Sequence, residues 1–221
     1  RISIALYRVA QRSQVCEALV EAAEQGKQVD VLMEVQARFD EGNNLRWGEV
    51  LEKAGVRMTY GIEGYKVHCK LCSIERMEGR ALVRYAYMGT GNFNESTARS
   101  YSDMALLTSN AAVTREVAAA LDHLMRATLP GPAKHLLLAP HDLRGAMERA
   151  IDKEIEQAFQ GRPASILLKL NSIEDKPLIR KLYDASRSGV RVRLIVRGIC
   201  CLATERPEHS GPITAISIVD R

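Results

Sequence analysis

The strongest constraint on the fold of this chain is a strand–helix–strand unit that occurs twice. Residues 18–35 (ALVEAAEQGKQVDVLMEV) align with residues 181–198 (KLYDASRSGVRVRLIVRG), and the alignment places Gly26 over Gly189 at the end of each helix. Any two such units look alike to some extent, because both need an apolar strand, an amphipathic helix and a glycine after it. The length of the match favours duplication, which predicts two fused modules that face a shared site.

The same alignment predicts which polar residues are equivalent in the two copies. Glu34 matches Arg197, and in the preceding strand, where IALYRV lies over LLKLNS, Arg8 matches Asn171. Arg8 and Arg197 therefore come near the carboxyl ends of predicted strands, where α/β sheets bind their ligands. Continuing the alignment puts the counterpart of His68 beyond the last residue of the sequence, so we expect the second module to be truncated.

The whole sequence alternates apolar strands with amphipathic helices, which is typical of an α/β fold with mixed, mostly parallel sheets flanked by helices. The segment LPGPAKH at 129–135 carries two prolines and a glycine, and it is the best candidate for a linker. We expect a first module at 1–128, a linker at 129–140 and a second module at 141–221. Strands are expected at 2–9, 28–35, 56–61, 65–74, 81–90, 165–173 and 190–199, and helices at 13–26, 44–55, 111–127, 141–160 and 175–189.

Composition narrows the class of partner. The net charge is +4 and only 5% of the 221 residues are aromatic. A mild positive charge is compatible with an anionic ligand, whereas so few aromatic rings argue against a base-stacking nucleic-acid surface. No apolar run reaches the roughly 18 residues of a membrane span, and no signal peptide opens the chain. Because both ends fall within apparent strands, we expect a fragment of a longer protein, in which missing targeting signals carry little weight.

The cysteines indicate a reducing, cytoplasmic setting. There are five, an odd number without the density of a disulfide scaffold. Cys69 and Cys72 form a CxxC, but on a strand this spacing points the two thiols to opposite faces, and the sequence has no second CxxC. Buried thiols therefore explain the pair better than a zinc site does.

The stretch EGYKVHCKLCSI (63–74) reads as a buried strand, yet it carries His68 and Lys70 at a spacing that puts both side chains on one face. A core histidine beside a lysine that extends its ammonium to solvent would explain the pair structurally. The functional interpretation is a histidine nucleophile for phosphorus, with Lys70 holding phosphate oxygens. Neutral imidazole is a good nucleophile near pH 7, and a phosphoryl group needs a nearby cation.

A glycine-containing loop, GTGNFN (89–94), follows the next predicted strand. Glycines let backbone N–H groups approach an anion closely, and Asn92 and Asn94 add further donors. The loop is a weak signal by itself, but its position after the HxK pair favours the phosphate-binding interpretation.

Together these motifs resemble the phospholipase D superfamily, in which HxK is followed by an aspartate and then by a Gly-Ser/Thr-x-Asn segment. The aspartate position is occupied here by Glu75, and this departure weakens a plain phospholipase or nuclease interpretation. Nearly the whole chain is similar to the C-terminal catalytic half of bacterial polyphosphate kinases, the long-chain type built on a phospholipase D-like fold. The similarity rests on LYRVAQRSQVCEALVEAAEQGKQVDVLMEVQARFDE, YKVHCKLCSIER, RYAYMGTGNFNESTARSYSD, DKEI and VRGICCL.

The resemblance implies reversible transfer of the γ-phosphate of ATP to inorganic polyphosphate through a phosphohistidine, with Mg²⁺ as cofactor. By this resemblance His68 is the phosphorylated nucleophile. Arg8 and Arg38 match arginines that grip phosphates at the magnesium-containing site, as a clamp on phosphate oxygens and not as metal ligands. Tyr101 matches a nucleotide-contacting tyrosine, and Arg197 matches a further arginine for the phosphates of ATP.

The resemblance also implies features that these 221 residues do not hold. A second catalytic histidine is expected beyond the last residue, and the full-length protein is expected to be a homo-oligomer, with peripheral membrane association left open. We expect the fragment alone to be inactive or nearly so. Two alternatives remain: a phospholipase D-type phosphodiesterase that uses the same His68, and a polyphosphate-binding module without turnover.

Overall fold

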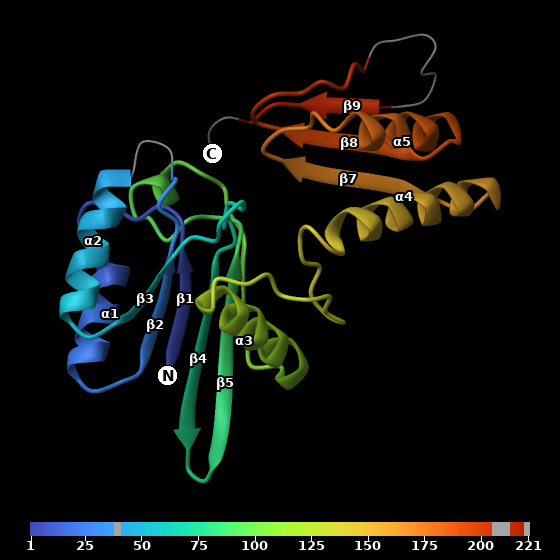
Figure 1. The fold of residues 1–221 in the computed structure, drawn as a ribbon. Coiled ribbons are helices and arrows are strands. Elements are labelled where there is room, and N and C mark those ends of the chain that lie inside the picture. The colour runs from blue at the N-terminus through green and yellow to red at the C-terminus, as the bar shows by residue number, and fades with distance from the viewer. Residues whose placement is uncertain (38–40, 205–212, 219–221) are drawn as a thin grey trace. The chain divides into compact units, whose positions relative to one another are not determined.

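A computed structural model describes residues 1–37, 41–204 and 213–218. The chain forms two compact units, Arg1–Leu138 and Ala139–Arg221. Both are α/β structures, which confirms the fold class expected from the alternating pattern (Figure 1). Among the described residues, none of the helices combines the length and the apolar character needed to cross a bilayer.

The first unit is built on a mixed six-stranded sheet with the order β3-β2-β1-β4-β5-β6. β1, β2 and β3 are parallel, whereas β4, β5 and β6 are joined to β1 and to one another by antiparallel pairs. The long connections between β1, β2 and β3 each contain one helix, as parallel strands require. The strands are β1 (Ile2–Leu6), β2 (Val29–Met33), β3 (Arg57–Tyr60), β4 (Leu71–Glu78), β5 (Ala81–Gly89) and β6 (Ala105–Thr108).

Helices cover both faces of this sheet. The helices are α1 (Gln14–Glu24), α2 (Glu41–Lys53) and α3 (Ala111–Met125), with a short 3₁₀ turn, η1 (Thr97–Arg99). One core joins α1 and α2 to side chains such as Ile4 and Val31, while a second core joins α3 to their strand neighbours Ala5 and Leu32. Successive strand residues point to opposite faces, so β1 and β2 supply both cores and read as continuous apolar runs.

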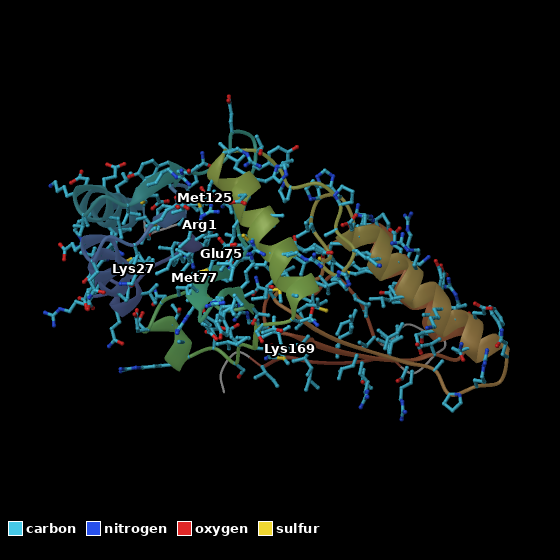
Figure 2. The ribbon with its side chains drawn as sticks, turned by 90° about the horizontal axis from the view of Figure 1, so that it is seen from below. Arg1, Lys27, Glu75, Met77, Met125 and Lys169 are labelled. Carbon is cyan, nitrogen blue, oxygen red and sulfur yellow. The ribbon has the colours of Figure 1, made fainter. Side chains whose placement is uncertain are left out.

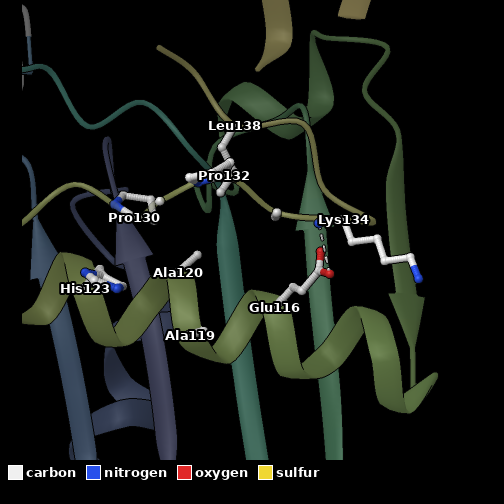
Figure 3. Close-up of a pocket in the computed structure, with 10 residues that line it drawn as sticks. Glu116, Ala119, Ala120, His123, Pro130, Pro132, Lys134 and Leu138 are labelled. Carbon is white, nitrogen blue, oxygen red and sulfur yellow. Dashed lines mark hydrogen bonds between the residues drawn. The ribbon is translucent and has the colours of Figure 1, made fainter. Parts of the chain in front are cut away.

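The segment after α3, which the prolines mark as a linker, packs back onto that helix. The Glu116 carboxylate accepts hydrogen bonds from three consecutive backbone N–H groups, those of Lys134, His135 and Leu136, at 3.2, 2.8 and 3.0 Å. Figure 3 shows Glu116 and the segment on the two sides of a cavity of about 310 Å³, which Pro130 also lines. One carboxylate thus holds this segment against the first unit as far as Leu136.

The second unit has a three-stranded parallel sheet with the order β7-β8-β9. Its elements are α4 (Leu143–Phe159), β7 (Ser165–Leu170), α5 (Lys176–Arg187), β8 (Arg191–Val196) and β9 (Ile213–Ile216). Asp175 caps α5 by accepting the N–H of Leu178, and Pro177 occupies the first turn, where its missing N–H costs nothing. The core lies between the sheet and both helices, around Ile151, Leu182 and Leu194.

The strand ladders correct the alignment of the repeat by one residue. β1 and β2 pair Ile2 with Val29, while β7 and β8 pair Ile166 with Val192, because the crossover is one residue shorter in the second unit. The match of Gly26 with Gly189 keeps its register: both glycines follow the helix with positive φ, of 77° and 91°.

The shift affects the polar residues at the strand ends differently. Glu34 N–H bonds to Leu6 O and Arg197 N–H bonds to Leu170 O, so Glu34 and Arg197 are equivalent as predicted. In the first strand, however, the residue equivalent to Asn171 is Tyr7, and the match of Arg8 with Asn171 was wrong.

The expected strand at 65–74 begins only at Leu71, so His68 and Lys70 precede β4 in a segment without regular structure. The backbone N–H and C=O groups of this segment do not form the ladder of hydrogen bonds that a neighbouring strand would give. Val67 N–H donates to the Glu34 side chain, and only at Lys70 O does the ladder with β5 begin, through Gly89 N–H. The alternation of a strand therefore does not explain why the two side chains meet.

Candidate active site

Four chain segments come together at one edge of the six-stranded sheet. β1 and β2 end there, and because β4 is antiparallel to β1, the segment that leads into β4 starts at the same edge. The carboxyl end of β5 and the amino end of β6 lie there as well, since Gly89 pairs with Ala105. This topology places Tyr7 and Arg8 after β1 close to His68 and Lys70 before β4, although they are far apart in sequence.

His68 is held between an aromatic ring and an amine. Its imidazole meets the Tyr7 ring edge to face, with 4.5 Å between the ring centroids and an interplanar angle of 77°. Its Nδ1 atom lies 3.1 Å from Lys70 Nζ. Burial lowers the pKa of His68 below its ordinary 6.5, and the positive charges of Lys70, Arg8 and Lys66 lower it further. The imidazole is therefore neutral at pH 7, the form in which it is nucleophilic.

Lys70 is a buried amine, only 4% exposed. It donates a hydrogen bond of 2.6 Å to the carbonyl oxygen of His68, so its ammonium group stays beside the imidazole. Burial lowers the pKa of Lys70 to about 8, and the charge of Asp103 opposes this shift. The ammonium form still dominates at pH 7, which leaves a desolvated cation next to the imidazole.

Tyr7 is the aromatic centre around which the cations gather. Lys70 Nζ, Arg8 Cζ and Lys66 Nζ lie 5.2, 5.5 and 6.0 Å from the centroid of its ring. A ring face carries partial negative charge and attracts cations, so one tyrosine helps to keep several positive groups near His68. Sequence reasoning missed Tyr7, and its position beside Arg8 at the strand end was the available signal.

Glu34, at the end of β2, fixes the segment that carries His68. Its side chain is almost fully buried, at 2% exposure. Oε2 accepts the N–H of Val67 at 2.8 Å and Oε1 accepts the N–H of Gln36 at 2.9 Å. Asn44 of α2 donates to the backbone carbonyls of both Glu34 and Tyr7, at 2.9 and 2.8 Å. Sequence reasoning placed Glu34 in the repeat but missed this role, which only the fold reveals.

The GTGNFN loop after β5 lies at the same edge, and Asp103 closes it. The Thr90 hydroxyl donates to the Asp103 carboxylate at 2.9 Å and also accepts the Met104 N–H at 3.0 Å. A side chain at Gly91 would collide with Asp103, because a Cβ there would lie 2.5 Å from Oδ2. Glycine at this position therefore permits the close approach, and Asp103 is a third residue whose role sequence reasoning missed, although it sits in the quoted RSYSD segment.

The two asparagines of the loop differ in how much of the side chain is free. The Asn94 side-chain oxygen accepts hydrogen bonds from the N–H groups of Ser96 and Thr97, both at 3.1 Å, and from the Ser96 hydroxyl at 2.8 Å. Its amide nitrogen alone remains for a ligand. The Asn92 oxygen is buried and makes no hydrogen bond within the described residues. Phosphate binding by either residue stays a prediction.

The roles of the remaining predicted site residues stay predictions. Arg38 lies outside the described residues. Tyr101 is 42% exposed and follows η1, with its N–H bonded to Thr97 O at 3.1 Å. Arg197 belongs to the second unit, where its Nε donates to the Asn171 side-chain oxygen at 2.7 Å.

Glu75, which occupies the aspartate position of the phospholipase D motif, lies away from His68. It sits in the middle of β4, where its carboxylate pairs with Arg84. The amino terminus of Arg1 donates to its carbonyl oxygen at 2.9 Å, and Figure 2 shows Arg1 and Glu75 close to each other. Arg1 begins the chain just before β1, whereas His68 lies by the end of β1, so Glu75 does not replace the missing aspartate.

The residues around His68 suit phosphate better than a protein-bound metal. Within the described ranges, no three His, Cys, Asp or Glu side chains come together as metal ligands would. The charged neighbours of His68 are Lys66, Lys70 and Arg8, whereas Mg²⁺ takes oxygen ligands. This set of donors does not fit a Mg²⁺ ion held by the protein itself, but it does fit one that arrives bound to phosphate oxygens.

Comparison with known proteins agrees with this chemistry. Residues 1–129 match the family described as "Polyphosphate kinase C-terminal domain 1", and residues 136–221 match "Polyphosphate kinase C-terminal domain 2". The chain is 46% identical over 220 residues to a polyphosphate kinase of Vibrio cholerae and 45% identical over 220 residues to one of Escherichia coli K12. All of this chain is covered in both cases, but only 31% and 32% of those proteins.

A solved structure gives the same result. The crystal structure of polyphosphate kinase from Porphyromonas gingivalis superimposes with a TM-score of 0.84 at 40% identity, over 99% of this chain and 36% of that one. The chain thus spans about a third of the length of the relatives that it matches. The two domain matches together cover almost every residue, and they place this chain in the polyphosphate kinase family, of which it carries both C-terminal domains.

Proposed function

We propose that this chain carries the phosphohistidine centre of an ATP:polyphosphate phosphotransferase, with His68 as the nucleophile. The observation that carries the proposal is the environment of His68: a neutral imidazole, held edge to face by Tyr7 and surrounded by Lys70, Arg8 and Lys66. A structural histidine in a core would not need three cations around it. A nucleophile that attacks a phosphoryl group does need them, because the incoming phosphates repel one another and the transition state carries their charge.

The first half-reaction forms a bond between His68 Nε2 and the γ-phosphorus of ATP. The bond from that phosphorus to the bridging oxygen breaks, and its electron pair leaves on the β-phosphate of ADP. In the second half-reaction, a terminal oxygen of polyphosphate attacks the same phosphorus, and the N–P bond breaks with its electrons returning to the imidazole. Each step is reversible, so the same centre makes ATP from polyphosphate and ADP.

Lys70 links substrate binding to the state of the imidazole. Attack through Nε2 requires that the ring proton sit on Nδ1, the atom 3.1 Å from Lys70 Nζ. An ammonium that turns from Nδ1 to a phosphate oxygen, while keeping its bond to the His68 carbonyl, frees Nδ1 to carry that proton. Arrival of the phosphate therefore supports the reactive tautomer and places a cation on the transferred group.

Other residues are assigned to substrate on the strength of the resemblance. Arg8 and Arg38 clamp phosphate oxygens, Tyr101 contacts the nucleotide, and Arg197 contributes a further cation from the second domain. Mg²⁺ bound to the phosphates of ATP would supply charge neutralisation there. Because the chain covers 31% of its relatives, turnover is a property proposed for the full-length protein.

Labelling with γ-³²P ATP tests the proposal in the full-length protein. We expect an acid-labile, base-stable label that is absent in His68→Ala and present in His123→Ala, a matched control because His123 is a histidine of α3 in contact with Thr128. Circular dichroism shows whether His68→Ala is folded, and His68→Asn serves as a second variant. A label that persists in both folded His68 variants would overturn the assignment.

The phosphodiesterase alternative finds less support. Its motif needs an acid where Glu75 stands, and the Glu75 carboxylate pairs with Arg84 on β4. Cleavage of a phosphodiester by the unlabelled protein, without any label from ATP, would nevertheless favour that class over the phosphotransferase.

A further inference from the structure

A second cavity, of about 530 Å³, opens beside the candidate active site and has no role in the reaction described above. Two short segments line it: the first supplies Ala10, Gln11 and Arg12, and the second supplies Glu95, Ser96 and Arg99. The first segment continues from Arg8, and the second continues from the GTGNFN loop. Both segments therefore start at the sheet edge that holds His68.

The two walls of this cavity are joined to each other. The Glu95 Oε1 atom accepts the N–H of Gln14, in the first turn of α1, at 2.8 Å. The backbone of the segment with Ala10 and Gln11 is held by α2. Arg46 donates a hydrogen bond to Gln11 O at 2.6 Å, and Trp47 Nε1 donates one to Ala10 O at 3.0 Å. The cavity is thus a feature of the folded unit, with its shape set by hydrogen bonds from two helices.

The charge of the cavity favours an anion. Arg12 and Arg99 are both exposed, and within the described residues neither guanidinium forms an ion pair or a hydrogen bond. The single carboxylate in the lining, that of Glu95, is half-buried: its Oε1 accepts the Gln14 N–H, and its Oε2 is buried without a hydrogen bond within the described residues. Two guanidinium forks free to turn toward the same space can each bind two oxygens of a phosphate.

We propose that this cavity is a subsite for the non-reacting phosphates of the polyphosphate chain, with Arg12 and Arg99 as its cations. The inference rests on the proposed function of His68. Polyphosphate repeats its charge along a chain, so phosphates beyond the reacting one need cations beyond Lys70 and Arg8. Arg12 lies four residues after Arg8, and Arg99 five after Asn94, so each arginine closely follows in the chain a residue of the candidate active site.

The subsite should discriminate by chain length. A phosphate chain long enough to reach from His68 to the cavity gains the two arginine contacts, whereas a chain too short to reach gains none. Removing the arginines should therefore weaken long polyphosphate and leave the transfer from ATP to His68 unchanged. This separation distinguishes the subsite from the reacting centre.

The test measures ATP synthesis from ADP and polyphosphate of defined lengths in the full-length protein, for Arg12→Gln, Arg99→Gln and the double variant. Arg80→Gln, at the exposed β4–β5 turn, is the charge-matched control. Charge-assisted contacts of this kind predict a KM for long polyphosphate raised about tenfold for each arginine, with the KM for short polyphosphate and the label from ATP unchanged.

Three outcomes decide between the explanations. An unchanged KM for long polyphosphate in the double variant overturns the subsite. An equal rise for short and long polyphosphate, or in Arg80→Gln, would show a general charge effect and likewise overturns it. If neither the parent protein nor any variant takes label from ATP, the proposed function fails. Fluorescence anisotropy with labelled long and short polyphosphate then still decides whether Arg12 and Arg99 bind the polyphosphate chain.

Discussion

Replacing Glu34 with alanine removes the carboxylate that holds the segment before β4 in place. That carboxylate is 2% exposed and accepts two backbone N–H groups, those of Val67 and Gln36. No other side chain takes over these bonds in an otherwise unchanged structure. The substitution should therefore loosen the backbone one residue away from His68 and lower the free energy of unfolding of the first unit.

The size of the effect follows from the number of bonds lost. A buried N–H left without a partner costs about 1–3 kcal/mol, so two such groups predict a loss of about 2–6 kcal/mol for Glu34→Ala. Glu34→Gln keeps one acceptor oxygen and turns an amide donor toward the other N–H, so about half of that loss is expected. A matched control is Glu63→Ala, because Glu63 is exposed on the same connection between β3 and β4.

Urea unfolding followed by tryptophan fluorescence measures the loss. Trp47 is the only tryptophan in the sequence and is buried in α2, so its signal reports the first unit alone. Glu63→Ala should lie within about 0.5 kcal/mol of the parent protein, as surface substitutions do. The reasoning is refuted if Glu34→Ala unfolds within that same margin, because the carboxylate would then not be what holds the segment.

Four further predictions concern the reaction and the linker. Burial and neighbouring cations lower the pKa of His68, and Lys70, with its pKa of about 8, must stay charged. The rise of kcat/KM for phosphorylation with pH should therefore have its midpoint below pH 6.5, and kcat/KM should fall through about pH 8; a rate still rising at pH 9 would contradict this. Gly91→Ala places a Cβ 2.5 Å from Asp103 Oδ2, so calorimetry should show a loss of about 1–3 kcal/mol and labelling should fall, whereas Gly42→Ala, in open space on α2, should change neither. Glu116→Gln weakens the acceptor of three linker N–H groups, so limited proteolysis should cut near Lys134 faster than in Glu148→Gln; equal rates would argue against the anchor. The isolated 221-residue chain should make no polyphosphate from ATP, since it spans only 31% of the length of a relative such as the Vibrio cholerae protein. Robust turnover would contradict this expectation.

The polar residues of the site divide into those that a local pattern can reveal and those that it cannot. His68, Lys70 and the glycine loop stand out because polar or flexible residues interrupt apolar runs at short spacing. Tyr7, Glu34 and Asp103 do not stand out, because their importance depends on which strand ends meet at one edge of the sheet. Their partners are distant along the chain, and no local periodicity records such contacts.

The sequence by itself determined the α/β class, the two units and the equivalence of the positions of Glu34 and Arg197 in the repeat. Helix and strand periods and the glycine after each helix are local properties. Tertiary structure alone decided two things. The strand ladder set the register of the repeat, in which a crossover one residue shorter moves Tyr7, and not Arg8, into the place of Asn171. The Glu34 carboxylate took the Val67 N–H, so the backbone at His68 is shaped by a buried side chain and not by a strand. Both depend on hydrogen bonds between residues far apart in the chain, which form only once the sheet has assembled.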